Sequence, residues 1–318
     1  MNIRNVVVAC LFICLSCKED SSKAKLLPPG NIPTTPYLTV LGIAQDGGFP
    51  HINNNQEFRQ AANNPSLIEL VVSLGLVDPT NQKKILFEAT PNMPEQLSIL
   101  ERNYLKTNKI IDGIFLTHAH IGHYTGLMHF GKEAMGSTNI PVMVMPKMKT
   151  FLETNGPWEQ LVTLKNIRLL PLAEDTAVQI TPAVKVIPFV VPHRDEYSET
   201  VGYKIVGQTK SALFIPDIDK WEKWNKSILA EVQKVDYAFL DGSFYADGEI
   251  PRPMSEIPHP FVTETVSAFA KADSITKSKI IFIHFNHSNP VLDPDFLGRK
   301  ELEAQGFRFA QQGAIYKL

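Results

Sequence analysis

The chain has 318 residues, of which 44% are hydrophobic and 20% are charged, a composition typical of a globular protein that can bury a core. Its 31 Lys and Arg residues nearly balance its 33 Asp and Glu residues, for a formal charge of -2, and no basic block occurs. Nucleic-acid binding requires a concentrated positive surface, so we expect no nucleic-acid partner.

All the cysteines lie near the amino terminus, at Cys10, Cys14 and Cys17. The rest of the chain therefore cannot form a disulfide framework, a cysteine-ligated zinc or iron-sulfur site, or a cysteine nucleophile. Any metal site in the body of the protein must be built from His and carboxylate side chains.

Residues 1–16 have the features of a signal peptide. Arg4 precedes an unbroken apolar run, Val6 to Leu15, which is too short to span a bilayer because a spanning helix needs about 20 apolar residues. The stretch Cys14-Leu15-Ser16-Cys17 resembles a bacterial lipoprotein signal, in which the cysteine after the cleavage point carries the lipid. An ordinary secretory signal is the alternative. Both interpretations predict export, and the first predicts a membrane anchor at Cys17, with the protein facing the periplasm or the cell exterior.

Residues 17–36 are interpreted as a proline-rich tether, since Pro28, Pro29, Pro33 and Pro36 separate the anchor from the rest of the chain. Residues 37–318 contain no internal repeat, low-complexity tract or second linker. We interpret them as one catalytic domain.

Short apolar runs in this domain alternate with amphipathic stretches. The runs predict strands at Tyr37–Ala44, Leu67–Ser73, Lys84–Glu88, Gly113–Thr117, Pro141–Met145, Val184–Val191, Gly202–Val206, Ala212–Ile215, Tyr237–Leu240, Ile280–Ile283 and Phe307–Ala310. The amphipathic stretches predict helices at Pro94–Tyr104, Gly122–Lys132, Pro146–Glu153, Trp221–Gln233, Phe261–Ala272 and Phe296–Gln305. Many strands with fewer helices favour sheet layers covered by helices.

The densest group of candidate ligands comes after the predicted strand that begins at Gly113. Three of the nine histidines, His118, His120 and His123, fall within six residues. Residues two apart at a strand end point to the same side, so His118 and His120 can bind one ion, and the next turn brings His123 back beside them. Three clustered histidines are costly to pack without a partner, so this spacing indicates a metal site.

Further candidate ligands occupy the same place relative to other strands. His193 follows the run that ends at Val191, Asp217 follows Ile215, and His284 follows Ile283. Catalytic loops gather where strands end, so we expect these side chains to meet at one edge. Asp217 taken alone also fits a turn residue or helix cap.

A His-x-His-x-x-His loop, with a later His, an Asp and a final His that each follow a strand, resembles the metallo-β-lactamase superfamily. The resemblance covers residues 37–318 and implies an α/β fold, the metallo-β-lactamase-like four-layer αβ/βα sandwich. Within the superfamily, Leu41–His51, Leu240–Phe244 and Ile283–Pro290 resemble the subgroup that contains the B protein of pyrroloquinoline quinone biosynthesis.

The resemblance implies a ligand set at the edge of the two sheets. It assigns a first metal ion to His118, His120 and His193, with Asp217 bridging to a second ion that His123 and His284 also hold. Zinc, as one or two ions, is the expected metal, and iron or manganese also suits His-rich sites.

The sequence departs from the superfamily at Gly122, because an aspartate usually precedes the third histidine of the motif. Three outcomes stay open: a single-metal enzyme, a second ion completed by another group, or a water molecule in the vacant position. His287, three residues after His284, is the best substitute by position, and it could equally contact substrate.

Metal chemistry suggests the reaction. A bound divalent ion lowers the pKa of its water to about 7 and polarises a carbonyl or phosphoryl oxygen, so no Ser or Cys nucleophile is needed. We therefore predict an exported metal-dependent hydrolase that acts on a small-molecule ester, lactone, amide or phosphoester. Asp217 would orient the hydroxide, and His287 or His259 could protonate the leaving group.

Two other segments are ambiguous in the sequence. The turn Gln45–Phe49 contains paired glycines and could line the pocket or simply reverse the chain. Asp241 follows a predicted strand, where it could orient a histidine ligand or cap a turn.

Two other functions stay open. One is an iron-dependent oxygenase related to pyrroloquinoline quinone biosynthesis, against which export argues, because making a cofactor from a peptide precursor is expected inside the cell. The other is a non-catalytic, metal-containing binding lipoprotein.

Overall fold

The computed structural model describes residues 32–251 and 253–318. The predicted signal segment, Cys17 and most of the predicted tether lie outside these ranges. Within them, no helix has the length and apolar character needed to cross a membrane.

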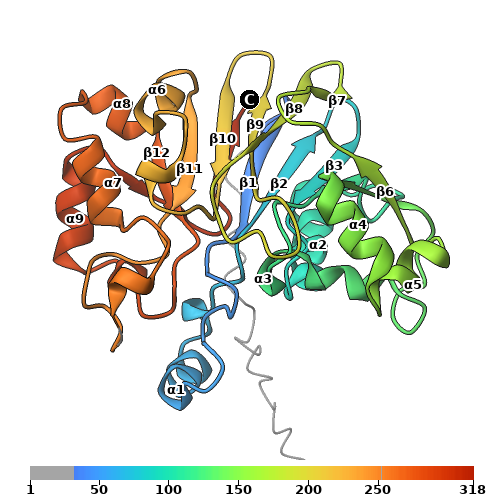
Figure 1. Ribbon diagram of the computed structural model, residues 1–318, viewed down its shortest axis with the longest axis horizontal. Helices are drawn as coiled ribbons and strands as arrows, with labels where there is room; N and C mark the ends of the chain where they lie inside the picture. The colour runs from blue at the N-terminus through green and yellow to red at the C-terminus, as the bar shows by residue number, and fades with distance from the viewer. Residues whose placement is uncertain (1–31, 252) are drawn as a thin grey trace, which may run out of the picture.

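Two seven-stranded sheets form the centre of the molecule (Figure 1). The first has the order β14-β1-β2-β3-β4-β5-β6 and the second β13-β12-β11-β10-β9-β8-β7. The strands of the first sheet are β1 (Tyr37–Gly42), β2 (Ser73–Asp78), β3 (Lys83–Phe87), β4 (Gly113–Phe115), β5 (Ile140–Val144), β6 (Ile167–Pro171) and β14 (Ile315–Lys317). Those of the second are β7 (Val178–Thr181), β8 (Val184–Val190), β9 (Val201–Val206), β10 (Ser211–Ile215), β11 (Tyr237–Asp241), β12 (Ile280–Ile283) and β13 (Arg308–Phe309).

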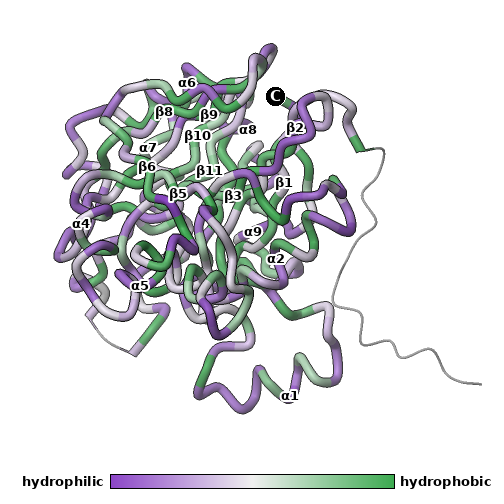
Figure 2. Tube along the Cα trace, turned by 90° about the vertical axis from the view of Figure 1, so that its right-hand side faces the viewer, coloured by the Kyte–Doolittle hydropathy of each residue, from purple (hydrophilic) through white to green (hydrophobic). Residues whose placement is uncertain are grey.

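Helices cover the outer face of each sheet, which completes four layers (Figure 1). Beside the first sheet lie α2 (Met93–Ile99), α3 (Ile121–Tyr124), α4 (Pro146–Thr154) and α5 (Trp158–Thr163). Beside the second lie α6 (Ile228–Gln233), α7 (Val262–Ala268), α8 (Ser274–Ser278) and α9 (Leu297–Ala304). The remaining helix, α1 (Asn55–Asn63), projects from the lower end, away from the hydrophobic body (Figure 2).

Burial on both faces of the sheets explains why the central strands are almost continuously apolar. In β1, Leu38 and Val40 belong to the hydrophobic cluster shared with the second sheet, whereas Tyr37 and Leu41 pack into the cluster under α2. This division arises from the two-residue period of a strand. Each sheet therefore packs against its partner sheet on one face and against helices on the other.

An aromatic group lies between the two sheets. The ring of Phe87 in β3 is 5.3 Å from Phe115 in β4 and 6.0 Å from Phe214 in β10, centroid to centroid. Tyr203 in β9 closes the group at 5.3 Å from Phe115. Because β3 and β4 lead directly into the ligand loops, this packing fixes the base of the site.

Several elements differ from the sequence-based expectation. The predicted strand Leu67–Ser73 is wrong, because β2 begins at Ser73, where pairing with β1 starts, and pairing with β3 starts at Leu74. The predicted helix Trp221–Gln233 is broken: a short 3-10 turn spans Trp221–Lys223, and Ser227 begins α6 by accepting a hydrogen bond from the Ala230 amide at 3.4 Å. The sequence analysis did not predict strands β6, β7 and β14 or helices α1, α5 and α8.

The two sheets are joined at the lower edge by the segment after β1. The Gln45 amide donates to the Phe285 carbonyl at 2.8 Å, and the Phe285 amide donates to the Ile43 carbonyl at 2.8 Å. These bonds hold the turn after β1 against the loop after β12. Residues about 240 positions apart in sequence thereby become neighbours at the edge where the predicted ligands lie.

We expect Phe87→Ala to lower the free energy of unfolding by about 3–5 kcal/mol, because it leaves a cavity in the aromatic group between the sheets. Urea denaturation followed by circular dichroism measures this change. Ile275→Ala, at a side chain that is 70% exposed on α8, is the matched control and should change stability by less than about 0.5 kcal/mol. An equal, small effect of both variants would contradict this account of the core.

Candidate metal centre

Three groups of potential metal ligands lie together at the lower edge of the sheets. Within each group, one ligand atom per residue lies within 4.8 Å of every other. The groups in the described chain are His118, His120, His193 and Asp217; Asp46, His123 and His284; and Asp217, Asp241, His259 and His284.

The first group has the spacing of a single-ion site. His118 Nε2 lies 2.8 Å from His120 Nδ1 and 3.3 Å from Asp217 Oδ2. His193 Nε2 lies 3.2 Å from Asp217 Oδ1. Ligand atoms bound tetrahedrally to one zinc ion at their usual distances lie roughly 3.4 Å apart, so this set can close around one ion with little movement.

The second group lies beside the first, and Asp217 faces both. His123 Nε2 is 3.2 Å from Asp46 Oδ1 and 3.7 Å from Asp217 Oδ2. His284 Nε2 is 3.9 Å from the same oxygen of Asp46. One carboxylate oxygen of Asp217 thus faces a ligand from each group, which is the position of a bridging ligand.

The buried polar atoms show whether a cation fits. Among the described residues, the buried atoms that form no hydrogen bond include Nε2 of His123, His193 and His284 and Oδ1 of Asp46 and Asp217. Buried polar groups without partners are costly, and here they point toward one another. Imidazole nitrogens and carboxylate oxygens are the donors that zinc, iron and manganese accept, so the residues fit a metal centre.

The other ring nitrogens of the first-group histidines are held from behind. Thr117 Oγ1 lies 2.8 Å from His118 Nδ1, and Asp219 Oδ1 lies 3.1 Å from His193 Nδ1. Such contacts fix the ring orientation and the tautomer of a metal-binding histidine. Neither Thr117 nor Asp219 was among the site residues predicted from the sequence.

The second-group histidines also have polar neighbours at their other ring nitrogens, and the backbone there is strained. Glu88 Oε1 lies 3.4 Å from His123 Nδ1, and Ser243 Oγ lies 2.8 Å from His284 Nδ1. Glu88 has φ 77° and His284 has φ 70°, in the left-handed region that non-glycine residues rarely adopt. Strain of this kind persists where the surrounding structure requires a particular side-chain position, as at a functional site.

Burial favours the neutral, metal-binding form of two histidines. Burial, together with the nearby His123, holds the pKa of His118 well below its usual range. Burial also lowers the pKa of His120 to about 4. Because a metal binds the neutral imidazole, these two ligands need lose no proton at neutral pH.

The carboxylates have the opposite effect on His123. Burial alone would lower the pKa of His123, but Glu88 and Asp46 raise it well above the usual range. For Asp217, burial alone would raise the pKa, but His193 and His259 hold it well below the usual range. Asp217 is therefore ionised, as a metal ligand must be.

His259 lies between two carboxylates at the edge of the site. Its Nδ1 is 2.8 Å from Asp241 Oδ2 and 3.1 Å from Asp217 Oδ1. Burial opposes the charged ring, but Asp241 and Asp217 together raise the pKa of His259 well above its usual range. Asp241 also accepts hydrogen bonds from the Ser243 amide and hydroxyl at 2.9 and 2.7 Å, so it orients residues of the site and also organises the turn.

The structure does not bring His287 to the position that the sequence analysis offered for it. His287 Nδ1 lies 2.8 Å from Glu57 Oε1, and its ring stacks on His51 with centroids 4.2 Å apart. His287 belongs to none of the ligand groups in the described chain, so it does not replace the missing carboxylate. The reason is that the chain turns after Phe285 and carries His287 toward the α1 segment.

Asp46 is a potential metal ligand that the sequence analysis did not predict. It comes after β1 just as His193, Asp217 and His284 come after their strands, so the same strand-end rule could have found it. The Asp46 side chain is 36% exposed, but its Oδ1 is buried against the histidines.

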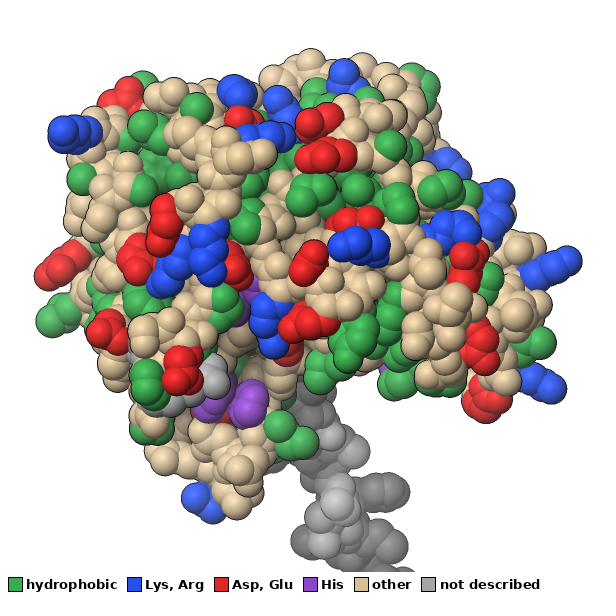
Figure 3. Space-filling model, viewed as in Figure 1, with side chains coloured by type: hydrophobic (Ala, Val, Ile, Leu, Met, Phe, Trp, Pro, Cys, Tyr) green, Lys and Arg blue, Asp and Glu red, His purple; other side chains and the backbone are tan. Residues whose placement is uncertain are grey.

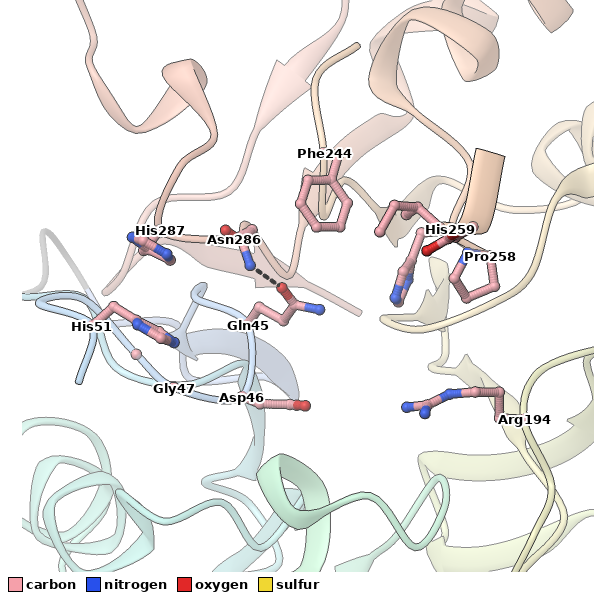
Figure 4. Close-up of a pocket in the computed structure, with 13 residues that line it drawn as sticks. Gln45, Asp46, Gly47, His51, Arg194, Phe244, Pro258, His259, Asn286 and His287 are labelled. Atoms are coloured by element: carbon pink, nitrogen blue, oxygen red, sulfur yellow. Dashed lines mark hydrogen bonds between the residues drawn. The ribbon is translucent and has the colours of Figure 1, made fainter. Parts of the chain in front are cut away.

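A pocket of about 390 Å³ opens beside the ligand groups. Figure 4 shows His51 and His287 on one side, His259 and Arg194 on the other, and Asp46 at the base. Histidine side chains are visible in a hollow at the lower edge of the molecule in Figure 3. The residues that line the pocket are Gln45, Asp46, Gly47, Gly48, His51, Arg194, Phe244, Glu256, Ile257, Pro258, His259, Asn286 and His287.

Comparison with known proteins places this geometry in a family context. Residues 83–285, more than half of the chain, match the family model described as "Beta-lactamase superfamily domain". Among curated proteins, the chain is similar to Coenzyme PQQ synthesis protein B of Gluconobacter oxydans (strain 621H), with 24% identity over 312 residues that cover 88% of this chain and 98% of that protein.

Solved structures share the fold. Zn(2+)-bound PqqB from Methylobacterium extorquens matches with a TM-score of 0.73 and 19% identity, covering 89% of this chain and 100% of that one. A diphosphatase from the PhnP family matches with a TM-score of 0.62 and 22% identity, covering 89% of this chain and 97% of that one. The four-layer fold and the superfamily resemblance expected from the sequence are confirmed.

We expect His193→Ala to lower the metal content of the purified protein, because it removes one of the converging ligands of the first group. His129→Ala, at a histidine outside the ligand groups of the described chain, is the matched control and should leave metal content unchanged. Inductively coupled plasma mass spectrometry measures both. Removal of metal with a chelator should also lower the melting temperature, since an ion at 100 times its Kd stabilises the folded state by about 2.7 kcal/mol. Unchanged metal content in His193→Ala would show that the ligand group is misassigned.

Proposed function

This chain belongs to the beta-lactamase superfamily, and on that premise we propose that it is a metal-dependent hydrolase of small anionic esters. The observation that carries the proposal is the set of adjoining ligand groups around Asp217 beside an open pocket. The two groups that meet at Asp217 would hold up to two divalent ions, an arrangement that would suit the hydrolysis of an ester.

A divalent ion bound by these side chains supplies Lewis acidity and lowers the pKa of water at the site to about 7. Asp217, ionised and buried, orients the attacking water through its carboxylate as well as holding the ligand groups together. The imidazole rings are kept in place by their polar neighbours, which are Thr117, Glu88, Asp219 and Ser243. The site therefore needs little reorganisation of its side chains during the reaction.

His259 is the residue that we propose as the proton donor to the leaving group. Asp241 and Asp217 hold its Nδ1, which leaves Nε2 as the ring nitrogen available to a substrate in the pocket. A positioned imidazole contributes typically 100-fold to 10,000-fold by general acid catalysis, on the order of 3–5 kcal/mol of barrier. His287, bonded to Glu57 and stacked on His51, is a substrate contact in this proposal and not an acid.

One cationic side chain of the pocket, Arg194, suits an anionic substrate, although Asp46 and Glu256 also line the pocket. In the described part of the chain Arg194 forms no salt bridge, and its neighbours Asp195 and Glu196 face Lys147 and His120 instead. An unpaired guanidinium can bind a phosphate or carboxylate through two parallel hydrogen bonds. Phosphoesters are therefore the first substrate class in the proposal, ahead of esters and lactones that carry a carboxylate.

The metal that we propose is zinc. The donors are imidazole nitrogens and carboxylate oxygens, which suit zinc but also iron and manganese. The similar PqqB structure from Methylobacterium extorquens is described as Zn(2+)-bound, which supports testing zinc first.

The curated relatives favour a second candidate function. Coenzyme PQQ synthesis protein B of Gluconobacter oxydans (strain 621H) is similar over 88% of this chain, so a biosynthetic role, as an iron-dependent oxygenase, is the alternative. A ligand set that accepts iron would serve it. Oxygen uptake by the iron-loaded protein distinguishes it from a hydrolase, which consumes no oxygen.

We expect zinc-loaded protein to hydrolyse bis(p-nitrophenyl) phosphate. Asp217→Ala should lower kcat/KM by roughly 100-fold or more, because the loss of even a residue that only supports a metal ligand typically lowers metal affinity or activity by 10–100-fold. Arg194→Ala should raise KM for this anionic substrate, and Arg194→Lys should recover part of the loss. A neutral p-nitrophenyl ester is the control, whose KM should not respond to Arg194. Failure to hydrolyse any class of ester, combined with oxygen uptake by the iron form, would replace the hydrolase with the oxygenase.

We also propose that the protein is exported and anchored through a lipid on Cys17. The support is the sequence alone: the short apolar run that ends before Ser16 and Cys17, with charged residues directly after it. Several acyl chains on one terminus hold a protein firmly on a membrane, whereas one chain binds only marginally.

We expect the full chain, produced in a bacterium, to partition into the detergent phase, and Cys17→Ser to abolish this partition. Cys14→Ser is the matched control, because it changes a cysteine of the apolar run and leaves the lipid acceptor intact. Mass spectrometry of the amino terminus reports the processing directly. An unprocessed amino terminus on protein from the cytoplasmic fraction would refute both export and the anchor.

A further inference from the structure

The carboxylate absent from position 122 has a counterpart elsewhere in the chain. A Cβ atom built on Gly122 would lie 2.1 Å from Asp46 Oδ1 and 2.7 Å from both Cα and Cγ of Asp46. Real Cβ atoms do not approach other atoms so closely. The Asp46 carboxylate therefore occupies the space into which a side chain at position 122 would begin to extend.

The same carboxylate reaches the second ligand group. Asp46 Oδ1 is 3.2 Å from His123 Nε2 and 3.9 Å from His284 Nε2. All three atoms are buried, and none of them forms a hydrogen bond in the described structure. Buried polar atoms without a hydrogen bond are costly, and one bound cation would satisfy this oxygen and both ring nitrogens together.

The turn that carries Asp46 is fixed by contacts on both sides. The Gln45 amide donates to the Phe285 carbonyl at 2.8 Å, and the Asn286 side-chain amide donates to Gln45 Oε1 at 2.5 Å. The Gly48 amide donates back to the Gln45 carbonyl at 2.8 Å, and Gly48 has φ +69°, which a glycine adopts without strain. Asp46 is thus held in place by the loop that also carries His284.

We propose that Asp46 is the carboxylate ligand of the second metal ion, supplied from the turn after β1 in place of an aspartate at position 122. Asp46 and Gly122 form a compensating pair: the glycine leaves room for the carboxylate, and the carboxylate supplies the ligand that the glycine lacks. The inference concerns the metal centre and holds whichever reaction the protein catalyses.

Metal stoichiometry and affinity test this assignment without reference to activity. Metal is first removed from each protein, and each is then titrated with zinc. The proteins are the full-length wild type, the variants Asp46→Ala, Asp46→Asn and Gly122→Asp, and the double variant Asp46→Gly with Gly122→Asp. A parallel titration with cobalt, followed by its absorption spectrum, reports which ligands bind the ion. Asp195→Asn is the matched control, an aspartate of the same site region that is 66% exposed and outside the ligand groups of the described chain.

We expect two zinc ions for the wild type and for Asp195→Asn, and a Kd for the second ion that rises at least tenfold in Asp46→Ala and Asp46→Asn. Gly122→Asp alone should lower the melting temperature without tightening the second ion, because its side chain collides with Asp46. The double variant should regain the second ion, since it moves the carboxylate to the neighbouring chain position while filling the same space.

Three results would overturn the proposal. The first is a wild type that binds a single zinc ion at saturation. The second is an Asp46→Asn variant that binds the second ion as tightly as the wild type does. The third is a folded double variant that binds the second ion no better than Asp46→Ala does. Asp46→Asn has almost the same shape as the native residue, so its result decides the question even if the double variant fails to fold. Wild-type stoichiometry without ester hydrolysis would leave this ligand assignment standing and reject the proposed function instead.

Discussion

The rest of the site depends on the buried carboxylate of Asp217. It lies 3.3 Å from His118, 3.2 Å from His193, 3.7 Å from His123 and 3.1 Å from His259, so one anion faces imidazoles from several loops. Ring nitrogens would not gather around one another in a protein interior without a shared charge. The buried, ionised Asp217 thus offsets the cost of gathering these imidazoles at one place.

Each loop reaches Asp217 because the sheets place strand ends at one edge. The loop of His118 comes after β4 in the first sheet, whereas Asp217 and His284 come after β10 and β12 in the second. The aromatic packing of Phe87 and Phe214 holds these sheets face to face. Packing between the layers therefore brings the two halves of the metal centre together.

The neighbouring polar residues make this arrangement rigid. Glu88 and His284 have left-handed backbone conformations, and both lie at the second ligand group. Their strain is offset by the buried contacts that they allow, from Glu88 to His123 and from His284 to Ser243. A site organised in this way before its cation binds has less freedom to lose on binding it.

The sequence by itself predicted the fold class, through the resemblance of its histidine motif, and it predicted candidate ligand positions from local patterns. Apolar runs mark the strands, and a His or Asp directly after such a run, as at His193 or Asp217, lies at the sheet edge whatever the details of packing. Only the tertiary structure showed that the Asp46 carboxylate, from a distant turn, occupies the space beside Gly122. The tertiary structure also places His287 away from the ligand groups, because its contact with Glu57 directs the loop toward α1. It places the start of β2 at Ser73, because pairing with β1 sets the register of that strand.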